Sequence, residues 1–168
     1  MGDNDDKQLS LYKLFSEVSS TATEVYNIAI EKEEIAIGSS LSHTVNLTLT
    51  YIEDFKPVDR QDIPVVPATP SGEPPKSPAE LQLEHEEWLR GIHKDIWEDI
   101  ANKRQELINA GRYNAAKPEL FRCWDAYIDM MKSDQINSLL GQIGAALLLL
   151  LCWINVIKKD LLTINLTK

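Results

Sequence analysis

The run His85-Glu86-Glu87-Trp88-Leu89 contains the residues best suited to chemistry, because it begins like the HExxH motif of zinc proteases. That motif places two histidines on one face of a helix, so that both imidazoles bind one zinc ion. Leu89 stands where the second histidine should be. The zinc-protease motif is therefore absent.

His93 is the next histidine, and its position on the same helix lies about 12 Å from His85 along the axis. Without further ligands this separation is too large for one metal ion. A di-iron bundle needs Glu-x-x-His pairs, but Gln82 and Arg90 occupy the positions three before the two histidines. We therefore expect His85 to be a hydrogen-bonded core histidine, with no metal and no cofactor. A metal-dependent helical enzyme using His85, His93 and nearby carboxylates is kept as an alternative.

Nucleophilic and phosphate-binding motifs are also missing from the sequence. It contains no Walker A, GxGxxG or GxSxG pattern. Cys123 has no histidine near it in sequence and stands beside Trp124 in an apolar stripe, which favours a core thiol over a nucleophile. Cys123 and Cys152 are far apart in two helical patterns, so we expect no disulfide and a reducing compartment. We predict no catalytic residue and no enzymatic activity.

Composition narrows the possible partners. The chain has 168 residues, a net charge of −9 and 43% hydrophobic residues, enough for one core. Because nucleic-acid binding depends on Lys and Arg neutralising phosphates, such an acidic chain is not expected to bind nucleic acid. No signal peptide is visible at the N-terminus. We expect an intracellular protein, and association with a membrane is left open.

The feature that dominates the sequence is residues 135–157, which contain no charged residue. A helix of this length could cross a bilayer. Five consecutive leucines cover every face of such a helix, so lipid or protein must enclose it. The residues expected to be buried in a membrane or against other subunits are Leu147, Leu148, Leu149, Leu150, Leu151 and Trp153.

Small residues near the start of this hydrophobic helix predict a close contact with another helix. They recur at near-helical spacing and would leave a shallow groove in the helix surface. The predicted helix-packing interface consists of Ser138, Gly141, Gly144 and Ala145. Ser133 or Asp134 is expected to cap the helix.

The N-terminal third predicts an acidic tail, residues 1–7, followed by a helical hairpin over residues 8–55. Apolar residues recur with the helical period as far as Ile35, and Gly38 stands where a C-terminal helix cap is expected. The second segment has a rival interpretation, because residues 41–54 include an alternating stretch rich in β-formers. We prefer the helix.

Residues 56–78 are rich in proline and predict a linker or extended spacer. A C-terminal helical unit follows over residues 79–162, and residues 163–168 form a tail. Ser77, Pro78 and Glu80 form a strong helix start. That helix is expected to end at Gly111, and a shorter helix is expected to begin at Pro118.

The sequence thus predicts a mainly α protein with an N-terminal hairpin, a Pro-rich linker and a C-terminal three-helix unit that includes one fully hydrophobic helix. We interpret it as a non-enzymatic assembly or interaction protein that binds a protein partner or itself. A small tail-anchored membrane protein is the first alternative.

Overall fold

The fold is described by a computed structural model covering residues 3–56, 77–132 and 138–164, with side chains from residue 8 onward. The described residues form five helices and no strand, which confirms the mainly α prediction. In chain order the helices are α1 (Asp3–Glu31), α2 (Ile35–Phe55), α3 (Pro78–Asn109), α4 (Tyr113–Lys132) and α5 (Leu139–Leu162).

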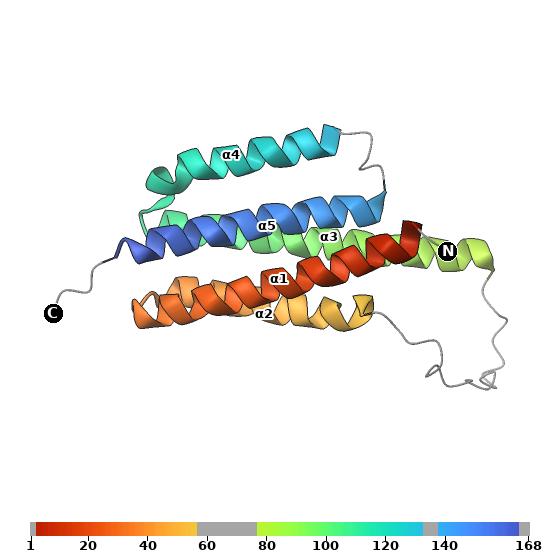
Figure 1. The fold of residues 1–168 in the computed structure, drawn as a ribbon, viewed down its shortest axis with the longest axis horizontal. Coiled ribbons are helices and arrows are strands. Elements are labelled where there is room, and N and C mark those ends of the chain that lie inside the picture. The colour runs from red at the N-terminus through yellow and green to blue at the C-terminus, as the bar shows by residue number, and fades with distance from the viewer. Residues whose placement is uncertain (1–2, 57–76, 133–137, 165–168) are drawn as a thin grey trace.

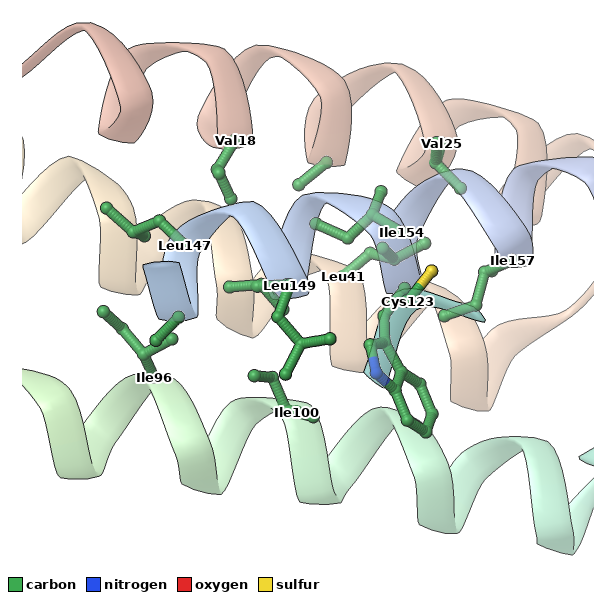
Figure 2. Close-up of a cluster of buried hydrophobic side chains, with 14 of the residues drawn as sticks. Val18, Val25, Leu41, Ile96, Ile100, Cys123, Leu147, Leu149, Ile154 and Ile157 are labelled. Carbon is green, nitrogen blue, oxygen red and sulfur yellow. The ribbon is translucent and has the colours of Figure 1, made fainter. Parts of the chain in front are cut away.

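The hydrophobic helix α5 is the centre of the bundle (Figure 1). Helices α1, α3 and α4 pack against it, while α2 packs against α1 and α3. Figure 2 shows Val18 of α1 and Ile96 of α3 pointing toward α5 from two sides, in the same buried cluster as Leu147 of α5. The two halves of the chain therefore share one hydrophobic core.

Residues 41–54 are helical, so the rival strand interpretation is wrong. The buried face of α2 is not purely apolar, because Leu49 is exposed whereas Thr44 and Thr48 are buried. The Thr48 hydroxyl donates a hydrogen bond to the Thr44 carbonyl one turn earlier in α2, and the Thr44 hydroxyl donates to Asp99 of α3. These bonds let two polar residues enter the core.

The turn between α1 and α2 corrects the prediction for Gly38. Helix α1 ends at Glu31, and Glu33 adopts a positive φ of 62°. The Glu34 N–H closes the turn by donating to the Ala29 carbonyl at 2.8 Å. Gly38 lies inside α2, where an added Cβ would come within 3.0 Å of the Ile30 Cδ1 atom. This glycine therefore permits close approach of the two helices.

The ends of α3 agree with the sequence signals. The Ser77 hydroxyl accepts a hydrogen bond from the Glu80 N–H at 3.2 Å, and Pro78 opens the helix. Gly111 has a φ of 73°, a conformation that glycine adopts without strain. Helix α4 begins at Tyr113, so the predicted start at Pro118 is wrong and that proline lies inside the helix.

Three other boundaries differ from the sequence prediction. Helix α1 begins at Asp3, within the expected acidic tail. Ser138 caps α5 by accepting a hydrogen bond from the Gly141 N–H at 3.1 Å, and α5 continues past residue 157 to Leu162. The expected caps at residues 133 and 134, and linker residues 57–76, lie outside the described residues.

Candidate functional site

A cleft of about 310 Å³ lies between α3 and α4, beside α5. Its lining is mainly aromatic and aliphatic. The lining residues are Trp97, Ile100, Ala101, Arg104, Tyr113, Leu120, Phe121, Trp124 and Trp153. We call this site the aromatic cleft.

Ring contacts fix the walls of the aromatic cleft. Trp97 of α3 meets Trp124 of α4 edge to face, with ring centroids 5.7 Å apart. The ring centroid of Tyr127 lies 5.2 Å from that of Trp97. Burial raises the pKa of the Tyr127 hydroxyl. The Trp97 indole N–H donates to His93 Nε2 at 3.0 Å, which orients the indole. These edge-to-face contacts are a favourable aromatic geometry.

The rim of the aromatic cleft is exposed and carries positive charge. Phe121 is 53% exposed and Trp124 is 44% exposed. The Arg104 guanidinium lies 5.1 Å from the centroid of the Tyr113 ring, and the Lys117 ammonium lies 5.3 Å from that of Phe121. Both are within the range of cation–π attraction. The cleft therefore offers aromatic surface together with nearby cations.

The base of the aromatic cleft includes Trp153 of α5, which is buried. Its indole N–H has no hydrogen-bond partner among the described residues. Buried indole N–H groups usually have such a partner. The described lining contains no cysteine, serine, histidine or carboxylate.

The four residues of the predicted helix-packing interface have different surroundings at the N-terminal end of α5. Ser138 is the N-cap, and Gly141 donates to it. Gly144 faces α1, where an added Cβ would lie 3.5 Å from a Leu11 methyl carbon and 3.7 Å from one of Leu14. Ala145 is buried.

The leucine run is covered mostly by the chain itself. Leu147, Leu149, Leu150 and Trp153 are buried, Leu151 is half-buried and Leu148 is 39% exposed. Helix α5 is the one described helix that is long and apolar enough to cross a membrane, with a mean hydropathy of 2.1. Of that apolar window, 56% is buried in the bundle. The buried core helix of a protein outside a membrane can have the same length and hydropathy.

The expectation of a core histidine at position 85 is wrong. His85 is exposed, because the first turns of α3 lie outside the hydrophobic core, and its ring contacts Trp88 at 5.5 Å. His93 is half-buried and accepts the Trp97 hydrogen bond. No group of three or more His, Cys, Asp or Glu residues is placed to hold a metal ion within the described ranges.

The sequence did not lead us to predict the buried polar cluster that lies between α2 and α3. Lys103 and Asp99 are fully buried and 2.9 Å apart. Asp99 also accepts from Thr44 at 2.6 Å and lies 2.9 Å from the His43 ring. Burial lowers the pKa of Lys103, while Asp99 opposes this change. The Lys103 ammonium also donates to the Ser40 carbonyl, so the cluster joins α2 to α3.

The signal for this cluster was present in the spacing of α3. The buried residues Ile92, Ile96, Ile100 and Leu107 define its core-facing stripe. Asp99 and Lys103 fall on that stripe at an i, i+4 spacing, which allows an ion pair within one helix. Sequence alone did not show that α2 would present polar partners to this pair.

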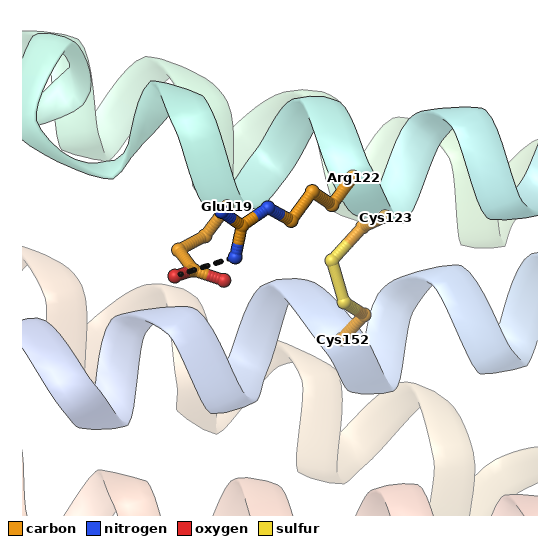
Figure 3. The surroundings of a disulfide bond; sticks show 4 residues. All are labelled: Glu119, Arg122, Cys123 and Cys152. Carbon is orange, nitrogen blue, oxygen red and sulfur yellow. Dashed lines mark hydrogen bonds and ion pairs between the residues drawn. A yellow bond between two sulfur atoms is a disulfide. The ribbon is translucent and has the colours of Figure 1, made fainter.

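The prediction for the cysteines is also wrong. Cys123 of α4 and Cys152 of α5 form a disulfide, with Cα atoms 6.1 Å apart, that bridges the two helices (Figure 3). The residues are 29 positions apart in sequence. The antiparallel packing of α4 on α5 brings them together, and this pairing was not visible in either helical pattern.

Comparisons of the chain with protein-family models, with curated proteins and with solved structures found no match.

Proposed function

We propose that this chain is a non-enzymatic helical interaction protein that binds a segment of a protein partner in the aromatic cleft. The observation that carries the proposal is the exposure of Phe121 and Trp124 at the rim of an apolar cleft. Burying one such side chain contributes about 1.5–3 kcal/mol. Trp, Tyr and Arg are also the residue types that dominate the energetics of known interfaces.

The charges around the cleft indicate the chemistry of the partner. The chain carries a net charge of −9, yet Arg104 lines the cleft and Lys117 lies over the Phe121 ring at its rim. A partner with a carboxylate beside its apolar residues would complement these cations.

The shape of the cleft favours a helical partner segment. The cleft lies between two helices, and an amphipathic helix commonly binds such a groove through apolar residues at i, i+3 and i+4 spacing. The described residues offer no sheet edge to which an extended strand could add. We therefore assign the partner as an amphipathic helix with large apolar side chains and a neighbouring acidic residue.

The membrane-anchor alternative requires a larger rearrangement. Helix α5 would have to leave α1, α3 and α4, which would expose core residues such as Val18 and Ile96 to water. This alternative predicts that the chain needs detergent for purification and resists carbonate extraction from membranes. The proposed interaction protein remains soluble and folded without detergent.

The proposal is tested by selecting peptides from a random library on the folded chain. We expect enrichment of sequences with large apolar residues at helical spacing and a nearby Asp or Glu. Trp124→Ala should weaken binding of the selected peptides by more than about tenfold, as expected for an interface tryptophan that contributes much of the binding energy. Leu49→Ala is the matched control, because Leu49 is exposed on α2 away from the cleft.

Two results would count against the proposal. Equal binding to the Trp124→Ala and unaltered chains would place the contact outside the aromatic cleft. Enrichment of proline-rich or basic sequences, including peptides matching residues 63–70 of this chain, would show that the assigned partner chemistry is wrong.

A further inference from the structure

We infer that the disulfide between Cys123 and Cys152 is a redox switch that controls the aromatic cleft by holding α4 against α5. The inference rests on the proposed function, because it concerns regulation of the same site. Cleft-lining tryptophans directly follow both cysteines in sequence, Trp124 after Cys123 and Trp153 after Cys152. The covalent bond therefore joins the two backbone segments that carry these tryptophans.

Helix α4 has few other attachments to the bundle. It buries only Ala116, Leu120, Cys123 and Tyr127 among its 20 residues, and it packs mainly against α5. By contrast, α5 buries ten residues between α1, α3 and α4. Segments with few buried apolar contacts open at low free energy. Without the disulfide, α4 is the helix expected to move.

The ion pairs on α4 do not replace the covalent bond. Glu119 pairs with Arg122 and with Lys159 of α5, each at 3.4 Å. The basic side chains of both pairs are about three-quarters exposed, at 77% and 74%. Exposed pairs of this kind contribute little to stability.

The disulfide is close enough to the surface for exchange. Cys152 is only partly buried, and Figure 3 shows Arg122 extending away from Cys123 toward Glu119, so its side chain does not cover the disulfide. A small dithiol reductant can therefore act at this bond after a limited local opening.

The exchange reaction is balanced with a dithiol as the reductant. One thiolate of the dithiol attacks a sulfur of the disulfide, the sulfur–sulfur bond breaks, and the other cysteine leaves as a thiolate that takes up a proton. The second thiol of the reductant then displaces the first cysteine in the same way. Two electrons pass to the chain, which gains two thiols, and the reductant becomes a disulfide.

Reduction would change the cleft because its two walls come from different helices. Phe121 and Trp124 would move with α4, whereas Trp97 would stay on α3. The edge-to-face contact between Trp97 and Trp124 would then be lost. The oxidised chain is thus the binding-competent form.

The first test measures hydrogen–deuterium exchange of the full chain with and without dithiothreitol, after mass spectrometry has counted the free thiols. We expect faster exchange in α4 on reduction, while exchange in α1, α2 and α3 is unchanged. The variant Cys123→Ala/Cys152→Ala should exchange like the reduced chain and should not respond to dithiothreitol.

Three results of this first test would overturn the inference. These are unchanged protection of α4 after complete reduction, unfolding of the whole bundle on reduction, and two free thiols in chain prepared without reductant. None of these results involves a binding partner, so none of them would contradict the proposed function.

The second test measures affinity for a peptide selected on the oxidised chain. Reduction should weaken binding by about tenfold, a typical coupling between two sites. The double variant should bind like the reduced chain in both conditions. Equal affinity of oxidised and reduced chains would overturn the switch. A failure to select any peptide on the oxidised chain would count against the proposed function. The hydrogen–deuterium exchange measurement would still show whether reduction makes α4 more mobile.

Discussion

Lys103 and Asp99 form an ion pair of 2.9 Å in which neither side chain is exposed to solvent. The pair lies where α3 meets α2, and the Lys103 ammonium also bonds the Ser40 carbonyl and the Thr44 hydroxyl. A buried pair of this kind is costly to desolvate, but it is far more costly to break, because the remaining charge is left without a partner.

We expect Lys103→Met to lower the free energy of unfolding by about 3–5 kcal/mol, the usual cost of removing one member of a buried pair. Lys94→Met is the matched control, since Lys94 and Glu98 form an exposed i, i+4 pair on the same helix. The control should change stability by less than about 0.5 kcal/mol. Urea denaturation measures both values. Similar small effects for the two variants would show that Lys103 is not paired in the core.

His93 should make stability depend on pH. Burial lowers its pKa below the ordinary value of 6.5, so in mildly acidic solution the unfolded chain binds a proton that the folded chain does not. The stability contribution is therefore fully present above pH 6.5 and is lost as the pH falls through the lowered folded pKa. Protonation also removes the acceptor of the Trp97 indole N–H, so tryptophan fluorescence should change over the same range.

His93→Gln tests this assignment, because glutamine keeps a hydrogen-bond acceptor without a titrating ring. In this variant, the free energy of unfolding should no longer show the decrease below pH 6.5 that His93 causes in the unaltered chain. His85→Gln is the matched control on the same helix, where His85 is exposed, and it should keep the profile of the unaltered chain. Identical profiles for all three proteins would exclude His93 as the source.

The stability of two Gly144 variants should show whether α5 packs loosely or tightly against α1. An added Cβ would meet methyl carbons of Leu11 and Leu14 at ordinary contact distances. Gly144→Ala should therefore stabilise the chain by up to about 1 kcal/mol through helix propensity. Gly144→Leu should destabilise it by about 1–3 kcal/mol through overpacking. Thermal melting compares the two, and a stabilising leucine would mean that α1 does not pack closely there.

The parts of the fold that could be predicted from sequence are those with local causes. The Ser77 cap follows from its own side chain, and the end of α3 follows from a glycine at position 111 with a positive φ. The helical period of α1 was also readable, because this helix buries one apolar stripe. From such signals the sequence specified the helical architecture, although several helix boundaries were missed.

The missed features depend on partners far away in the chain. Glu33 forms a turn that usually takes glycine, and Asp99 enters the core only because α2 offers Thr44 and His43. The aromatic cleft was not predicted from the sequence. Its walls form when α4 docks on α5, a long-range arrangement that periodicity does not encode.

The most direct test of the proposed function follows the four indole N–H resonances by NMR while a selected acidic, apolar peptide is added to the oxidised chain. Trp97, Trp124 and Trp153 line the aromatic cleft, whereas Trp88 lies outside it and stacks on Phe55, so it serves as an internal control. We expect the three cleft resonances to shift or broaden while that of Trp88 stays in place. Binding that moves Trp88 and leaves the other three unchanged would contradict the proposed function.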